Sequence, residues 1–324
     1  MRQRDDGRTM AAVLVEVLLN GSADEAVIAA GAIPLRGSGA VEDRVRSGLR
    51  WGTRDVPRVA GSGVAIWTEL LSPDGHRREA ALQTLDQAAP CGFLLAVLLR
   101  RLNDWVVSVR LAARAAVRRC VARSDPVQVA EVALSLLVES RSWRRDGSGQ
   151  QVIRGILAQA DLQDAVLRRM CDASARPVTL AALMVGEAFD GILPSLATDA
   201  VVPGIRAGAV QALARGDIRT VVGWEKVWVD RRYNVFAWKP VLEVRRIVCA
   251  PASDAALRDF VRDPSAVVRR ALLDGLRDRG APETRDIAAL LIDDPWPSIR
   301  ERVAFLLRDQ EASQAAINAA KRDR

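Results

Sequence analysis

A pattern of one arginine and two apolar residues recurs along the chain and constrains its fold more than any other feature. Each Arg is followed by a small or apolar residue three positions later and an apolar residue seven positions later, which places all three on one side of a helix. The copies are Arg78/Ala81/Leu85, Arg110/Ala113/Val117, Arg206/Ala209/Leu213, Arg269/Leu272/Leu276 and Arg300/Val303/Leu307. Successive arginines are 32, 96, 63 and 31 residues apart, close to multiples of about 32. The sequence therefore predicts an array of helical copies that bury faces against one another.

Each copy is expected to be a helix pair with an aspartate where the second helix begins. Asp104, Asp263 and Asp294 stand shortly before a repeat Arg, and the last two precede a proline, a combination typical of helix starts. We expect the Asp to cap its helix and the Arg to bind that Asp or the Asp of a neighbouring copy. We call this series of Asp–Arg pairs along the array the ladder. Its expected members are Asp104, Arg110, Asp263, Arg269, Asp294 and Arg300. Each exposed pair would contribute less than about 1 kcal/mol to the stability of the fold.

The pattern Asp-Pro, then Val-Arg or Ile-Arg, then Ala-x-x-x-Leu resembles the HEAT repeat, in particular the short HEAT-like repeats first associated with phycobilisome lyases. The resemblance covers about 72–309 and is strongest at 90–123 and 254–309. It implies an all-α fold, a right-handed α-solenoid of helix pairs whose second helices line a concave surface. It implies no particular chemistry, since the family includes scaffolds, transport factors, lyases and nucleic-acid binders. Nothing in the sequence indicates bilin binding.

Three regions are expected. Residues 1–71, interrupted by several glycines, should form an irregular helical cap with helices at 9–20, 23–31, 41–50 and 64–71. Residues 72–309 should form the repeat array, with insertions at 140–150 and 221–240, and residues 310–324 a polar capping helix. Within the array, further helices are expected at 105–123, 126–139, 240–250, 254–262, 265–279, 283–292 and 297–308.

The composition agrees with closely packed helices. Hydrophobic residues make up 49% of the chain and aromatic residues 4%, so we expect Ala, Val and Leu to supply the core, and no segment has the pattern of a run of alternating strands. The four cysteines are far apart in apolar helical patterns, which predicts free thiols in a reducing compartment. No apolar run approaches the roughly 20 residues that a membrane helix needs. We expect a cytoplasmic protein without membrane contact.

The sequence offers no recognisable catalytic site. His76 is the single histidine and lies in the polar turn SPDGHRRE, where a solvated side chain is the simplest interpretation. Metal ligands are not closely spaced, and no phosphate-binding glycine motif occurs. We therefore expect a non-enzymatic protein without cofactor or metal.

Arginines that the repeat does not require are candidates for binding. The net charge is +7 and almost entirely due to Arg, which either attracts polyanions or reflects biased composition. On the helix 105–123, Arg110, Arg114 and Arg118 recur every four residues and Arg119 lies beside them. We call these four residues the arginine strip, a flank of like charge suited to phosphate contacts.

The two insertions combine basic with aromatic residues. The first, SRSWRRDGSGQ at 140–150, could extend the arginine strip, or Trp143 could fold back onto the core. The second, VVGWEKVWVDRRYNVFAWKP at 221–240, holds five of the fourteen aromatic residues. If the insertion were helical, Trp224 would stack on Trp228. Residues 235–238 instead have the pattern of an extended strand, which favours a short hairpin. Core packing and exposure as an interface both remain open.

Three functions are compatible with these features. The first is a scaffold that binds another protein through its concave helices and the 221–240 insertion. The second is nucleic-acid binding through the arginine strip, with salt-sensitive affinity. The third follows from a resemblance: one group of bacterial alkylpurine DNA glycosylases is built from HEAT-like repeats and uses an Asp among tryptophans, and the comparable pairings here are Asp104-Trp105 and Trp228-x-Asp230. The candidate binding residues are Trp105, Arg114, Arg118, Arg119, Arg141, Trp143, Arg144, Arg145, Trp224, Trp228, Arg231, Arg232, Tyr233 and Trp238.

Overall fold

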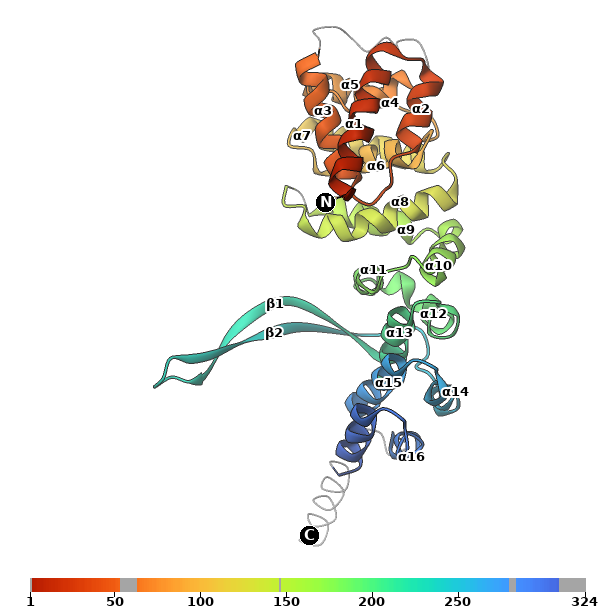
Figure 1. The fold of residues 1–324 in the computed structure, drawn as a ribbon, viewed down its shortest axis with the longest axis vertical. Helices are drawn as coiled ribbons and strands as arrows, with labels where there is room; N and C mark the ends of the chain where they lie inside the picture. Colours follow the sequence, from red (N-terminus) through yellow and green to blue (C-terminus); the bar gives the residue numbers. More distant parts are fainter. Residues whose placement is uncertain (1, 53–62, 146, 280–283, 309–324) are drawn as a thin grey trace. The chain divides into compact units, whose positions relative to one another are not determined.

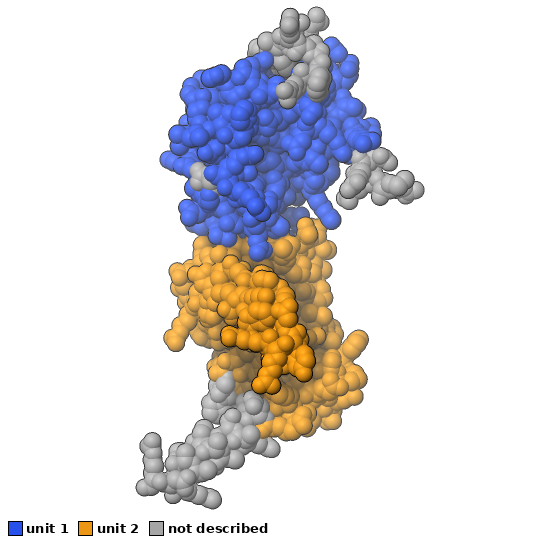
Figure 2. All heavy atoms as spheres, turned by 90° about the vertical axis from the view of Figure 1, so that its left-hand side faces the viewer, with its two compact units in different colours: residues 1–169 blue, residues 170–324 orange. Residues whose placement is uncertain are grey.

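The computed structural model describes residues 2–52, 63–145, 147–279 and 284–308. Over these residues the chain is mainly helical, with one two-stranded antiparallel sheet. It divides into two compact units, Met1–Arg169 and Met170–Arg324 (Figure 2). The expected capping helix at 310–324 lies outside the described residues.

Unit 1 is built from helices packed around the apolar helix α6 (Figure 1). Every side chain of α6 from Phe93 to Leu99 is buried, which follows from its sequence GFLLAVLLR because a helix that is apolar all round must be covered on all sides. The elements are α1 Arg2–Asn20, α2 Ala23–Gly31, α3 Ser38–Gly52, α4 Ala65–Glu69, α5 Gly75–Thr84, α6 Gly92–Arg100, η1 Arg101–Asn103, α7 Val107–Val121, α8 Pro126–Glu139, η2 Ser140–Ser142, α9 Ser148–Leu157, η3 Ala160–Leu162 and α10 Gln163–Cys171, which ends in unit 2.

Unit 2 contains the ribbon, our name for the two strands that span residues 217–246, among helices. The elements are α11 Pro177–Leu183, η4 Glu187–Ile192, α12 Leu193–Asp199, α13 Pro203–Arg215, β1 Asp217–Asp230, β2 Val235–Arg246, α14 Asp254–Asp259, η5 Phe260–Arg262, α15 Ala266–Arg279 and α16 Thr284–Ala289, and residues 297–308 are also helical. The helices expected at 126–139, 254–262, 265–279 and 297–308 are confirmed, apart from small differences at their ends.

Helices α13 and α15 pack closely because a glycine lies between them. A Cβ atom added to Gly275 would lie 2.7 Å from the Cβ atom of Ala214 and 2.9 Å from the carbonyl oxygen of Gln211. Both distances are shorter than van der Waals contact, so a side chain at this position would push the two helices apart. On its other side, α15 contributes to a core of Leu273, Ala288, Leu291, Ile299, Val303 and Leu306.

The helix expected at 240–250 is wrong, since these residues belong largely to β2. Gly216 ends α13 in the left-handed conformation, with φ of 79°. The chain then forms β1 over 14 residues and returns as β2 over 12 residues, with Asn234 at φ 53° in the turn. The spacing of Trp224 and Trp228 was ambiguous because residues i and i+4 share a face in a strand as well as in a helix. The hairpin alternative is the correct one, and the hairpin is longer than expected.

Candidate functional site

The ribbon separates its side chains into two chemically different faces, because cross-strand neighbours in a sheet point to the same side. One face carries the pairs Val221–Leu242, Trp224–Pro240, Lys226–Trp238 and Trp228–Phe236, with Val244 next to them opposite Arg219. We call Val221, Trp224, Lys226, Trp228, Phe236, Trp238, Pro240, Leu242 and Val244 the aromatic face. The opposite face carries the pairs Thr220–Glu243, Gly223–Val241, Glu225–Lys239, Val227–Ala237 and Asp230–Val235.

The centre of the aromatic face is a cluster of rings, two of which contact the exposed side chain of Lys226. Phe236 lies edge to face with Trp228 and Trp238, with ring centroids 5.9 and 6.2 Å apart. The Lys226 ammonium lies 4.1 Å from the centroid of Trp228 and 4.0 Å from that of Phe236. Cation–π attraction therefore holds Lys226 within the cluster.

This apolar face is exposed to solvent. The exposed fractions are 63% for Trp224, 58% for Trp238 and 57% for Val244, and they lie between 38% and 45% for Val221, Trp228, Phe236 and Leu242. Figure 1 shows the ribbon extending away from the helices of unit 2. Exposed apolar surface of this extent typically marks an interaction site, and a hairpin that packs against nothing is marginally stable in water. Among the described surfaces, the aromatic face is thus the strongest candidate for an interface.

The base of the ribbon is fixed to unit 2. Ile218 and Ile247 are buried. Arg245 donates to both carboxylate oxygens of Asp190 at 2.8 and 2.7 Å and to the carbonyl oxygens of Met184 and Gly186 at 2.7 and 2.9 Å. Hydrogen bonding to Asp190 raises the pKa of Arg245. The ribbon is therefore positioned by an ion pair and two buried apolar contacts at one end, while its faces stay accessible.

The predicted ladder is confirmed in part, since three repeat arginines bind the Asp of the next copy, whereas Arg110 and Arg300 donate to backbone carbonyl oxygens. In three copies, Nε and Nη2 of the Arg donate to the carboxylate of the next copy's Asp: Arg78 to Asp104 at 3.0 and 2.9 Å, Arg206 to Asp263 at 2.9 and 3.1 Å, and Arg269 to Asp294 at 2.6 and 3.2 Å. The Nη1 atom donates to a carbonyl oxygen six residues earlier, as it also does in Arg110 and Arg300. The repeat arginines are therefore structural.

These ion pairs are more buried than the sequence suggested. The side chains of Arg78 and Asp104 are 0% and 1% exposed, and those of Arg269 and Asp294 are 8% and 2% exposed. The estimate of less than about 1 kcal/mol, which applies to exposed pairs, is therefore wrong for them. Removing one partner of a buried pair costs about 3–5 kcal/mol, because the other charge stays buried without compensation.

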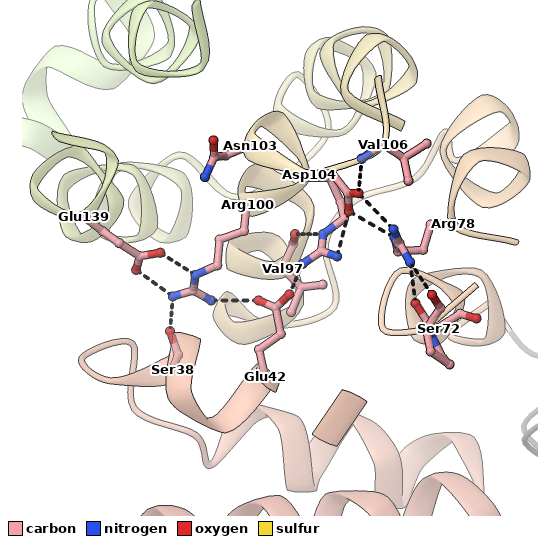
Figure 3. A network of polar contacts seen from close by, with 12 residues as sticks. Ser38, Glu42, Ser72, Arg78, Val97, Arg100, Asn103, Asp104, Val106 and Glu139 are labelled. Carbon is pink, nitrogen blue, oxygen red and sulfur yellow. Dashed lines mark hydrogen bonds and ion pairs between the residues drawn. The ribbon is translucent and has the colours of Figure 1, made fainter. Parts of the chain in front are cut away.

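In unit 1 the pair Arg78–Asp104 belongs to a larger buried network (Figure 3). Arg101 donates to Asp104 at 3.1 Å and also to Glu42. Arg100 donates to Glu139 at 2.8 Å and forms an ion pair with Glu42 at 3.3 Å. These contacts join helix α3 of the amino-terminal region to α5, α6 and α8. Arg100 and Arg101 therefore stabilise the packing of these helices.

The two aspartates singled out by the glycosylase comparison both have structural partners. Burial alone would raise the pKa of Asp104, but hydrogen bonds from Arg78 and the Val106 amide, together with the charge of Arg101, hold it below its usual value. Asp230 accepts hydrogen bonds from the backbone amides of Arg232 at 2.8 Å and Tyr233 at 3.4 Å, which stabilises the turn of the ribbon. Neither arrangement resembles a carboxylate free to act on a substrate.

The arginine strip on α7 is largely engaged in contacts within unit 1. Arg119 donates to the carbonyl oxygens of Leu85 at 3.0 Å and Leu82 at 2.8 Å, at the end of α5. Arg114 donates to the hydroxyl of Ser148 in α9. Arg118 is exposed, and Trp105 before the helix is 62% exposed. The strip is therefore not a continuous array of free guanidinium groups.

The insertion at 140–150 folds back onto unit 1. A Cβ atom on Gly149 would lie 3.0 Å from the ring of Trp143 and 3.4 Å from Leu102, so Gly149 packs closely against both the indole and Leu102. The backbone amide and Nη1 of Arg145 donate to Asn103, both at 3.3 Å. Arg141 and Arg144 are exposed. Trp143 folds back onto Gly149 but stays half-buried, so it lies at the margin of the core.

The structure brings one subset of the predicted binding residues together. Trp224, Trp228 and Trp238 share the aromatic face, and the exposed side chains of Arg231, Arg232 and Tyr233 form the tip of the ribbon. The sequence-based prediction missed Lys226, Leu242 and Val244. The signal for the last two was the alternation in Lys239–Arg246, KPVLEVRR, which continues the strand beyond the expected insertion.

The remaining sequence features give no further site. His76 is exposed, and the four cysteines are free, with Cys91 and Cys120 buried. Among the described residues, no group of three His, Cys, Asp or Glu side chains could hold a metal ion. None of the helices in the described ranges combines the length and the apolar character needed to cross a bilayer.

Comparisons of the chain with models of protein families and with curated proteins found no match. The resemblance to HEAT repeats thus rests on the repeat pattern of the sequence alone.

Proposed function

We propose that this protein is a non-enzymatic interaction scaffold, a right-handed α-solenoid of HEAT-like helix pairs that presents the ribbon to a partner protein. The single observation that carries the proposal is the exposure of the aromatic face, in which Trp224 and Trp238 are 63% and 58% exposed. Tryptophan is enriched at the centres of protein interfaces, where its truncation commonly costs 2 kcal/mol or more. The Arg–Asp pairs support the array, because three of them link one copy to the next.

Nucleic-acid binding is the second candidate, and the charge of the ribbon favours it. Seven basic and four acidic residues lie between 217 and 246, and Arg231 and Arg232 at the tip are exposed. A two-stranded ribbon has dimensions that fit a DNA major groove. The engagement of Arg114 and Arg119 within unit 1 speaks against the arginine strip as the binding surface.

Site-specific photo-crosslinking in the source cells tests the proposed function. Adjacent residues Trp238 and Lys239 lie on opposite faces of β2, so each is replaced in turn by p-benzoylphenylalanine. We expect a defined protein adduct from position 238 and a much weaker one from position 239. The proposal is contradicted by equal adducts from both positions or by no protein adduct. Adducts that nuclease digestion removes would instead support the nucleic-acid candidate.

A further inference from the structure

The two faces of the ribbon differ in their charged residues. Lys226 is the charged residue of the aromatic face, whereas the carboxylates Glu225, Asp230 and Glu243 lie on the opposite face together with Lys239 and Arg245. At the base, Arg219 forms an ion pair with Asp278 at 2.7 Å, and Asp217 with Arg215. An occupant that covers the aromatic face must therefore supply an anion for Lys226, since a buried unpaired charge is strongly unfavourable. A second copy of the ribbon would bring another lysine and no carboxylate.

The edges of the ribbon are poorly suited to the addition of a third strand. Pro240 in β2 has no backbone N–H to donate. The pairing of β1 is shifted between Val221 and Gly223 and again between Trp228 and Asp230, as at β-bulges. Proline and bulges are features that prevent edge pairing in natural sheets. A partner is therefore expected to cover the face of the ribbon and not to extend the sheet.

The dimensions and composition of the face match a helix. The stretch Phe236–Leu242 of β2, which pairs with Val221–Trp228, rises about 20 Å at roughly 3.3 Å per residue, which equals the length of a helix of about 13 residues. Packing against a helix is one of the ways in which a two-stranded hairpin becomes stable. The aliphatic residues Val221, Leu242 and Val244 lie at the base end of the face and the rings at its outer end, and this face carries no amide or hydroxyl side chain that could read base edges.

We propose that the aromatic face binds an acidic amphipathic helix of a partner protein, and that Lys226 selects a carboxylate on that helix. This inference rests on the proposed function and specifies the chemistry of the partner. The apolar side of the helix covers Trp224, Trp238 and Leu242. A carboxylate at its margin receives the Lys226 ammonium, which Trp228 and Phe236 hold in place.

The test uses the full chain and two stapled helical peptides of about 18 residues. Both carry leucines at i, i+3, i+4 and i+7, and the other positions are glutamate in one peptide and glutamine in the second. We expect the glutamate peptide to bind at least about tenfold more tightly in fluorescence anisotropy, the range of one charge-assisted hydrogen bond. Lys226→Met should abolish this preference. Lys239→Met, which removes the same charge from the opposite face, should leave both affinities unchanged within about twofold.

Four results would overturn the proposal. The first two are equal affinity of the wild type for the two peptides, and an equal loss of affinity for the glutamate peptide in the two lysine variants. The other two are no binding of the glutamate peptide at about 100 μM, and tighter binding of a labelled oligonucleotide than of the glutamate peptide. Circular dichroism of each variant checks that the fold is retained. If position 238 yields a protein adduct while the glutamate peptide fails to bind, the partner chemistry is wrong and the proposed function stands. If no protein adduct forms, the proposed function itself fails.

Discussion

At the scale of single residues, the repeat arginine connects two copies because its guanidinium group carries donors in a rigid fork. In Arg78, two nitrogens bind the carboxylate of Asp104, and the third binds the carbonyl oxygens of Ser72 and Pro73. Asp104 in turn accepts the Val106 amide at 3.0 Å. A lysine could not supply this planar arrangement. The same geometry recurs in Arg206 and Arg269, so the ladder is a property of the repeat.

Replacing Asp104 by Asn should destabilise unit 1 by about 3–5 kcal/mol, because it leaves the buried Arg78 without a counter-charge, whereas Arg101 keeps Glu42. Urea unfolding followed by circular dichroism measures the change. The control is Arg123→Ala, just after α7, which breaks the ion pair with Asp86; the side chains of Arg123 and Asp86 are 51% and 50% exposed. That change should cost less than about 1 kcal/mol. Similar losses in both variants would show that burial does not determine the strength of these pairs.

The same carboxylates predict an acid-sensitive stability. Burial opposes ionisation of Asp104 and Asp294, but hydrogen bonds from arginine and backbone amides lower the pKa of both below its usual value. Their contribution is complete above the unfolded pKa of about 3.9 and is lost as pH falls through the lower native pKa. Between about pH 4 and pH 2, the wild type should therefore lose more stability than Asp104→Asn. Urea midpoints at several pH values measure this difference, and parallel curves would refute it.

At the scale of elements, the helices were predictable and the ribbon was only partly so. Asp125-Pro126 and the apolar run that follows define α8, whose bounds Pro126–Glu139 agree with the prediction. For the ribbon, Trp224 and Trp228 fit both periods, and Val241-Leu242 resembled the start of a helix after Pro240. Whether Trp224 and Trp238 were buried or exposed depends on what lies next to the strands, which no local pattern encodes.

Replacing Gly275 by Ala should destabilise unit 2 by about 1–3 kcal/mol, because the new methyl group would overlap Ala214 and the backbone of α13. Gly155 in α9 is the matched control, since a Cβ atom there meets nothing within 4 Å. Gly155→Ala should stabilise unit 1 by about 0.5–1 kcal/mol through the backbone entropy of the unfolded chain. Thermal unfolding of both variants measures the effects. A neutral Gly275→Ala variant would contradict the close packing of α13 on α15.

At the scale of the whole molecule, the sequence predicts the repeat character but not the partner. Arg206 and Asp263 lie 57 residues apart and still form a ladder pair, so the ribbon is an insertion between two copies that stack directly. The repeat pattern could predict this pairing because it spans the insertion. The chemistry that we propose for the partner is inferred from the residues on each face of the ribbon. The strand register is needed to assign residues to these faces.

Excising the outer ribbon tests the central claim, that the aromatic face is the binding surface, most directly. Thr220 and Glu243 are cross-strand neighbours, so an Asn-Gly turn can replace residues 221–242 and leave Ile218, Arg245 and Ile247 in place. Calorimetry then measures the affinity for the protein captured at position 238. The account predicts an unchanged helical spectrum and thermal midpoint with at least a roughly 100-fold loss of affinity. Unchanged affinity in the folded variant would contradict it.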